Sequence, residues 1–336
     1  MATTLVATAI GIGIAMLVRP GTFLSTQQQA AFRQAYEQTL AERQHTAEEL
    51  QQKSPLQWMV EQFPDNLVAA AQDNRQMLKV ILATLLLGIA FTTVESERTA
   101  PIRQLLSALF AVLLAAVRLI MRFAPVGVFA LMAALPMEWS LLSALGMYSL
   151  SVLGGLGLIL ALFYPLVVRV LGKFRVRDFY RALLPVHLVA FSTSSSAATL
   201  PATLEACCTR LGVRPELASF VLPLGATINM DGTSLYQAVA TVFLAQLYGI
   251  ELAFPQLVLL IVLAVAASIG AAPVPGASIV MLIVMLQNLG IPQEGVALIL
   301  AVDRLLDMSR TVVNVTGDAT ACVVLSAWDR AQHRAS

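Results

Sequence analysis

Polar residues recur at helical spacing along an apolar segment near the end of this 336-residue chain, at Asp303, Asp307, Arg310, Asn314 and Asp318. At about 100° per residue, this spacing places them on one stripe of a helix. A charged stripe is costly in lipid, so we expect it to face the protein interior. A guanidinium can bind a carboxylate through two hydrogen bonds, and the aspartates can accept an ammonium or a cation. The stripe therefore favours a site for a charged ligand and a cation. The alternative is a helix held by buried ion pairs.

A second polar patch interrupts an earlier apolar segment over residues 222–234. Gly225 and Gly232 flank Asn229 and Asp231, and local unwinding there would expose backbone carbonyls. Carbonyl, amide and carboxylate oxygens are the hard ligands that suit cations such as Na⁺. The patch predicts a cation site, and a kinked helix that tolerates one aspartate is the alternative.

The composition places these groups in a membrane. Hydrophobic residues make up 58% of the chain, charged residues 12%, and the mean hydropathy is +0.77. Soluble domains carry about 25% charged residues, so a water-soluble enzyme is excluded. The net charge of +1 gives no reason to expect nucleic acid as a partner, and the three cysteines form no disulfide framework. Apolar runs of about 20 residues predict an all-α polytopic membrane protein.

The basic residues predict the orientation. They concentrate in residues 169–181 and 209–216 and after residue 327, whereas the loop over 21–75 has an acidic excess. The positive-inside tendency puts the basic segments in the cytoplasm and the acidic loops outside.

Residues 182–208 and 255–290 differ from ordinary transmembrane helices because small and polar residues interrupt each of them, at 191–201 and 268–278. By the charge pattern, each segment begins and ends on the same side of the membrane. We therefore expect two re-entrant hairpins, one from each side. Non-helical backbone at membrane depth needs protein or a water-filled cavity around it, and paired broken segments indicate a transporter's central site.

These features together favour co-transport of an anionic amino acid with a cation. Arg310 would bind its side-chain carboxylate, and Asp307, one turn away, would accept its ammonium. The hairpin tips would offer serine hydroxyls and backbone N–H groups to its α-carboxylate. The cation ligands would then be Asn229, Asp231, Asn314 and Asp318.

An intramembrane protease is a competing hypothesis. The aspartyl type requires Gly-x-Gly-Asp, whereas residues 315–318 read Val-Thr-Gly-Asp. The serine type requires a histidine on another helix. His187 lies on the arm of the serine-rich segment itself, where a packed histidine is the favoured interpretation.

Four motifs resemble the dicarboxylate/amino acid:cation symporter family, the glutamate transporter homologues. They are SSSAATLP at 194–201, LPLGATINMDGTSLYQ at 222–237, SIGAAPVPGAS at 268–278 and DRLLDMSRTVVNVTGD at 303–318. The resemblance covers essentially the whole chain and implies a glutamate-transporter-like fold with two re-entrant helical hairpins and broken transmembrane helices. It also implies a transport domain that moves like an elevator against a homotrimeric scaffold in the plasma membrane, which is the inner membrane in a Gram-negative bacterium.

The resemblance also implies a division of the chain. The segments are a first transport-domain helix at 1–20, an external loop at 21–75, partial scaffold helices at 76–135, a transport domain at 141–328 and a cytoplasmic tail at 329–336. Within the transport domain we expect a helix at 141–171, hairpin one at 180–208, a helix at 215–247, hairpin two at 255–290 and a helix at 295–327. The family has two further scaffold helices before the helix that begins here at Met1, so we expect an N-terminally truncated or reduced member.

The family motifs imply a role for individual residues. The substrate shell would be Ser195, Ser196, Thr233, Val274, Asp307, Arg310, Thr311 and Asn314. One sodium site would comprise Gly225, Asn229, Asn314 and Asp318, and a second Thr227, Met230, Ser268, Ile269 and Ala271. A third would comprise Asn229 and Asp231 with Thr3 and Thr4.

The expected function is a secondary active symporter, not an enzyme, that imports L-glutamate or L-aspartate with Na⁺ or H⁺ and without an organic cofactor. A C4-dicarboxylate carrier of the same family has no ammonium for Asp307 to bind. A neutral amino acid carrier would have a small residue in place of Arg310. A truncated, non-transporting remnant is the remaining alternative. The only partners expected besides the substrate are membrane lipid and further copies of the chain.

Overall fold

The computed structural model describes residues 1–23, 63, 65–72, 77–123, 126–127, 129–130, 139–270 and 275–335. Its α-helices are α1 (Ala2–Val18), α5 (Leu67–Gln72), α6 (Met77–Thr93), α7 (Ser96–Met121), α9 (Trp139–Leu158), α10 (Tyr164–Val170), α11 (Val176–Thr193), α12 (Ser196–Glu205), α13 (Pro215–Ile228), α14 (Asp231–Leu247), α15 (Phe254–Gly270), α16 (Ala277–Asn288) and α17 (Val296–Ala335). Shorter 3-10 turns cover Pro20–Phe23 and Gln293–Gly295, and π-helical turns cover Ile159–Phe163 and Ala206–Arg210. Over the described residues no strand occurs, so the all-α expectation is confirmed there.

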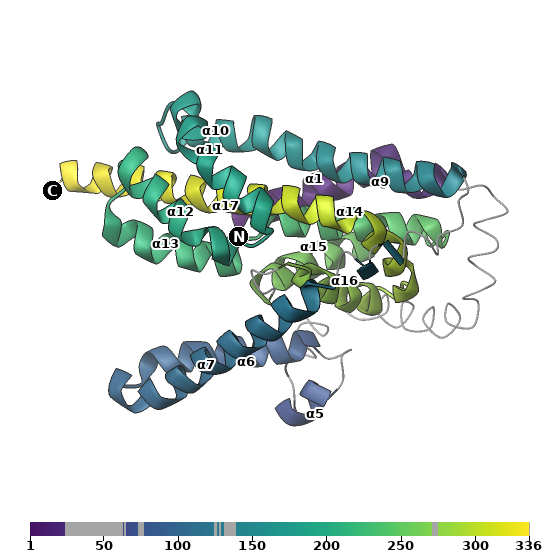
Figure 1. Cartoon of the computed structure of the whole chain (residues 1–336), viewed down its shortest axis with the longest axis horizontal. Coiled ribbons are helices and arrows are strands. Elements are labelled where there is room, and N and C mark those ends of the chain that lie inside the picture. Colours follow the sequence, from purple (N-terminus) through teal and green to yellow (C-terminus); the bar gives the residue numbers. More distant parts are fainter. Residues whose placement is uncertain are drawn as a thin grey trace.

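Helix α17 runs through the middle of the molecule and packs against α14, α11, α13 and α9 (Figure 1). All five residues of its polar stripe are buried, so the stripe faces protein rather than lipid. The helix also continues to Ala335 through the expected tail. Arg330 near its end donates to the carbonyl of Ser326 at 3.2 Å.

The apolar segment over 215–247 forms two helices rather than one. Helix α13 ends at Ile228 and α14 begins at Asp231, so the break lies inside the patch where we expected unwinding. The backbone N–H of Asn229 closes α13 by donating to the carbonyl of Gly225 at 2.9 Å. The break frees the next backbone groups and turns both polar side chains toward α1 and α17.

Two pairs of helices correspond to the two interrupted segments. Helix α11 packs on α12, and the chain reverses at Ser194, whose φ of 50° lies in the left-handed region. Ser195 then caps α12, its hydroxyl accepting from the N–H of Ala198 at 3.2 Å. Helix α15 likewise packs on α16. The backbone between 270 and 275 lies outside the described residues.

Within the residues that the structure describes, two helical stretches are long and apolar enough to cross a membrane, namely Ala2–Phe23 and Trp139–Val170. Helices α6 and α7 lie apart from the rest of the bundle in Figure 1, with α6 contacting α15. Large apolar side chains on α7 are exposed, for example Leu105 at 67% and Val112 at 65%. An apolar face of this kind indicates contact with lipid or with another protein.

Helices α1 and α14 pack closely against each other. A Cβ atom added at Gly11 would lie 2.8 Å from the carbonyl oxygen of Leu235, whereas one added at Gly13 would meet nothing within 4 Å. We expect Gly11→Ala to lower the free energy of unfolding by roughly 1–3 kcal/mol because the two backbones must separate. Gly13→Ala, the matched control, removes a helix-weakening glycine without a clash. Thermal unfolding of both purified variants in detergent tests this; equal midpoints would contradict the close contact.

Candidate functional site

The guanidinium of Arg310 is held by an ion pair within its own helix. Its Nε and Nη2 atoms donate to Oδ1 of Asp307 at 3.1 and 2.8 Å. Asp303 lies on the other side, with its Oδ1 atom 3.6 Å from Nη1. The ring of Tyr236 on α14 lies below the guanidinium, 4.4 Å from Cζ, in a cation–π contact. The cation is 2% exposed, so it depends on these neighbours for compensation.

Asp307 also connects α17 to the segment between α15 and α16. Its second oxygen, Oδ2, accepts from the backbone N–H of Gly276 at 3.2 Å. Thr311, one turn further along, is buried and donates to the carbonyl of Asp307 at 2.8 Å. A ligand that engages Asp307 therefore competes with both Arg310 and Gly276.

The break between α13 and α14 gathers oxygen atoms from three parts of the chain. The hydroxyls of Thr3 and Thr4 on α1 donate to Oδ1 of Asp231 at 3.1 and 2.9 Å, and to Oδ1 of Asn229 at 2.9 and 3.2 Å. Tyr164 on α10 donates to Oδ2 of Asp231 at 2.8 Å. The predicted third cation site thus comes together in space, and a hydroxyl faces each carboxylate oxygen of Asp231.

Asn314 joins α17 to the beginning of α14. Its carbonyl oxygen accepts from the backbone N–H groups of Gly232 at 2.8 Å and Thr233 at 3.4 Å. Its amide nitrogen donates to the hydroxyl of Thr233 at 3.1 Å. The structure therefore brings two residues of the predicted substrate shell into direct contact.

Asp318 lies one turn beyond Asn314 and is 3% exposed. Its Oδ1 atom has no hydrogen-bond partner among the described residues. A Cβ at Gly225 would lie 2.5 Å from this oxygen, so only glycine allows α13 to approach it this closely. A buried carboxylate with an unpaired oxygen favours neutralisation by a cation or a proton.

The remaining predicted residues are less tightly gathered. Ser195 and Ser196 lie buried at the start of α12, which packs on α17. Of the predicted second cation site, Ser268 is buried and donates to the carbonyl of Val265, whereas Thr227 is exposed and donates to the carbonyl of Leu224. Met230 directly precedes α14, and Ile269 is described only by its backbone within α15. Ala271 and Val274 lie outside the described residues.

Three residues of the site were missed by the sequence analysis, namely Tyr164, Tyr236 and Gly276. Tyr236 belongs to the second motif, but its contact with Arg310 depends on how α14 faces α17. Tyr164 carries the hydroxyl that donates to Asp231, and a tyrosine in the middle of an apolar segment was the only available signal.

The donor set suits a hard monovalent cation rather than a transition metal. In the described part of the chain, no three His, Cys, Asp or Glu residues are placed to hold a metal ion. The groups that do converge are hydroxyl, amide and carboxylate oxygens. The Nε2 atom of His187 forms a hydrogen bond with the hydroxyl of Thr316 on α17 at 3.0 Å. This contact agrees with a packed histidine rather than with the general base of a serine protease.

Comparison with known proteins identifies the family. The model of the "Sodium:dicarboxylate symporter family" matches residues 1–328. The chain is 33% identical to the "Proton/sodium-glutamate symport protein" of Bacillus subtilis (strain 168) over 328 residues, which cover 97% of this chain and 74% of the relative. It is 34% identical over 333 residues to the "Proton/glutamate-aspartate symporter" of Escherichia coli (strain K12), with the same coverage.

A mammalian relative matches over a shorter stretch. "Excitatory amino acid transporter 3" of Mus musculus is 40% identical over 260 residues, which cover 75% of this chain and 49% of the relative. The chain therefore spans about half of that transporter. The relatives are transporters of the membrane and not enzymes, which excludes the protease hypothesis. By the extent of the family match and of these identities, this chain belongs to the sodium:dicarboxylate symporter family.

Proposed function

We propose that this protein is a secondary active symporter that imports L-aspartate or L-glutamate together with Na⁺ or H⁺. The observation that carries the proposal is the buried pair of Arg310 and Asp307, with an N–O distance of 2.8 Å. An acidic amino acid can replace this ion pair with two ion pairs between substrate and protein. Its side-chain carboxylate binds the guanidinium of Arg310, and its ammonium binds the carboxylate of Asp307.

The same exchange explains the choice of substrate. Separating Arg310 from Asp307 leaves two buried charges, and a buried charge without a partner costs about 3–5 kcal/mol. A C4-dicarboxylate compensates Arg310 but leaves Asp307 without a cation. A neutral amino acid compensates Asp307 but leaves the guanidinium with only Asp303. A substrate with both groups avoids both penalties, so we propose specificity for an acidic amino acid.

The proposed cations neutralise the aspartates around the break in the α13–α14 segment. Asp231 with Asn229, Thr3 and Thr4 offers one cluster of oxygens, and Asp318 with Asn314 and backbone carbonyls near Gly225 offers another. Asn314 contacts both this region and Thr233 of the substrate shell. Binding of the cation and of the amino acid is thereby linked through one side chain, so each should strengthen the other.

We further propose that α1 and α9–α17 form a transport domain that moves like an elevator against α6 and α7 in a trimeric plasma-membrane assembly. In this arrangement α11–α12 and α15–α16 are the two re-entrant hairpins. The separate position of α6 and α7 and the exposed apolar side chains of α7 support this division. The backbone N–H of Gly276 donates to Asp307, so a substrate that binds Asp307 would displace this hydrogen bond and alter the α15–α16 hairpin.

Uptake of radiolabelled L-aspartate into proteoliposomes tests the proposed function, with sodium and proton gradients imposed separately. We expect accumulation of aspartate under at least one inward gradient, because a symporter couples uptake of its substrate to the entry of an ion down its concentration gradient. Excess unlabelled L-glutamate should compete, whereas succinate and L-alanine should not. Absence of uptake under both gradients would contradict symport, and equal competition by succinate would contradict the role of Asp307.

A further inference from the structure

A pocket of about 460 Å³ lies at the end of α1, remote from the polar stripe of α17. Its walls come from the end of α1, the end of α14, the turn that follows α14, and the first turns of α15. This volume falls in the range of about 300–1,000 Å³ that is typical of small-molecule sites. By the charge pattern of the loops, this end of the helices faces the outside of the membrane.

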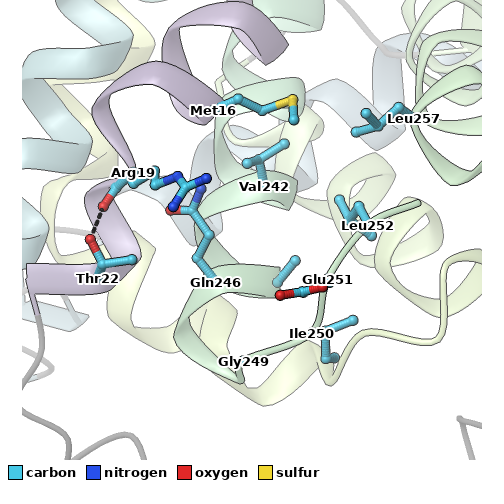
Figure 2. Close-up of a pocket in the computed structure, with 11 residues that line it drawn as sticks. Met16, Arg19, Thr22, Val242, Gln246, Gly249, Ile250, Glu251, Leu252 and Leu257 are labelled. Atoms are coloured by element: carbon cyan, nitrogen blue, oxygen red, sulfur yellow. Dashed lines mark hydrogen bonds between the residues drawn. The ribbon is translucent and has the colours of Figure 1, made fainter. Parts of the chain in front are cut away.

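Two opposite charges line this pocket, Arg19 and Glu251. Figure 2 shows Arg19, Gln246 and Glu251 among the residues that line the pocket. Within the described ranges neither charged group forms an ion pair or a side-chain hydrogen bond. Both residues are exposed, so a ligand in the pocket can reach them.

The floor of the pocket is fixed by Gln246. Its Nε2 atom donates to the carbonyl of Ala15 at 3.1 Å, and its Oε1 atom accepts from the N–H of Gly21 at 3.0 Å. These bonds tie the end of α1 to α14 across 225 and 231 positions of sequence. A pocket whose floor is held in this way exists before a ligand arrives.

Arg19 is held in a specific conformation. Its φ of 49° lies in the left-handed region, which costs a residue with a side chain about 1–2 kcal/mol. Its N–H donates to the carbonyl of Ala15 at 3.0 Å, and its carbonyl accepts from the hydroxyl of Thr22 at 2.8 Å, the bond dashed in Figure 2. The unfavourable backbone conformation is thus fixed at the residue that supplies the pocket's cation.

The other walls are apolar. Met16 comes from α1, Leu252 from the turn and Leu257 from α15 (Figure 2). Leu252 and Leu257 also pack on the hydrophobic core. An apolar wall with one cation and one anion is complementary to a molecule that has an anionic group, an ammonium and an aliphatic body.

We propose that this pocket is a second binding site, for an aliphatic zwitterion that places its anionic group on Arg19 and its ammonium on Glu251. A free aliphatic amino acid and the headgroup of phosphatidylethanolamine both have this chemistry. The occupant contacts the beginning of α15 and is separate from the site at Arg310. This inference does not depend on the proposed transport function.

Binding of tritiated L-leucine to the purified full-length chain in phosphatidylcholine nanodiscs tests the site. We expect saturable binding that excess L-aspartate does not displace and that Asp307→Asn leaves intact. Arg19→Gln and Glu251→Gln should each weaken it by about tenfold, since each removes one charged hydrogen bond. The matched controls Arg169→Gln and Glu205→Gln change exposed residues elsewhere and should leave binding unchanged.

Ligand analogues and lipid distinguish the two sources. Leucine methyl ester lacks the carboxylate and 4-methylpentanoate lacks the ammonium, so neither should compete. Leucine binding to the parent chain is compared between nanodiscs that contain phosphatidylethanolamine and nanodiscs of phosphatidylcholine alone. If leucine binding is lost only in the presence of phosphatidylethanolamine, that lipid is the natural occupant. If it does not displace leucine, the free amino acid is. Leucine binding that is lost in Asp307→Asn, or that both pocket variants leave unchanged, would overturn the proposal, as would the absence of binding by either probe.

Discussion

Replacing Arg310 with alanine is expected to abolish binding and uptake of L-aspartate and L-glutamate. The guanidinium lies 3.6 Å from a carboxylate oxygen of Asp303 and 2.8 Å from one of Asp307. Without it, the substrate carboxylate would enter a buried site next to two uncompensated aspartates. Removing one member of a buried charge pair costs about 3–5 kcal/mol, so affinity should fall by at least about a hundredfold. Isothermal titration and uptake in proteoliposomes both measure this.

Arg304→Ala provides the matched control. Arg304 lies on the same helix but is exposed, so its removal should leave aspartate affinity unchanged. Retained binding of at least one neutral amino acid by Arg310→Ala would show that the variant still folds, because Asp307 remains to accept an ammonium. Unchanged aspartate affinity in Arg310→Ala would remove the substrate assignment.

Replacing Asp318 with asparagine is expected to weaken binding of the coupling cation, so that aspartate binding requires more sodium. Asp318 is buried and its Oδ1 atom has no partner in the described part of the chain, so the carboxylate needs a cation or proton. Asparagine keeps the shape but removes the charge. The sodium concentration that gives half-maximal aspartate binding should therefore rise by at least about tenfold, which corresponds to about 1.4 kcal/mol.

The same variant should weaken cation binding but increase the thermal stability of the sodium-free protein. In sodium-free buffer, Asp318→Asn should unfold at a higher temperature than the parent chain, because a buried uncompensated charge has been removed. Asp329→Asn is the control: this residue lies on the same helix in an exposed ion pair with Arg214, and neither readout should move by much. An unchanged sodium requirement combined with an unchanged unfolding temperature would exclude Asp318 as a cation ligand.

Much of the site could be predicted because its signals are local. The stripe on α17 follows from spacings of three and four residues, which are fixed by the geometry of any α-helix. The break between α13 and α14 follows from glycines around Asn229 and Asp231, two polar groups that an apolar helix does not tolerate without a partner. Neither inference requires knowledge of the residues that pack against these helices. The burial of Asp303 through Asp318 and the interruption after Ile228 agree with them.

Other features depend on contacts between distant residues. The hydroxyl of Thr3 meets Asp231 across 228 positions, and Tyr164 meets the same carboxylate across 67. The resemblance to a known family implied the first contact, but no spacing in the sequence indicates either. The contact of Tyr236 with Arg310 likewise requires the rotation of α14 about its axis, which packing against α1 and α17 sets.

The low charge content and the long apolar runs were sufficient, without a structure, to predict an all-helical membrane protein, and the spacing of the remaining charges predicted a site for a ligand and a cation. These properties follow from the cost of exposing charge to lipid and from helix geometry, which act residue by residue. The tertiary structure alone decided the partner of each charge. It paired Arg310 with Asp307 and Tyr236, surrounded Asp231 with hydroxyls and left an oxygen of Asp318 without a partner. The reason is physical: a buried charge takes its partner from whatever side chain the packing brings within about 3 Å, and sequence distance does not limit that choice.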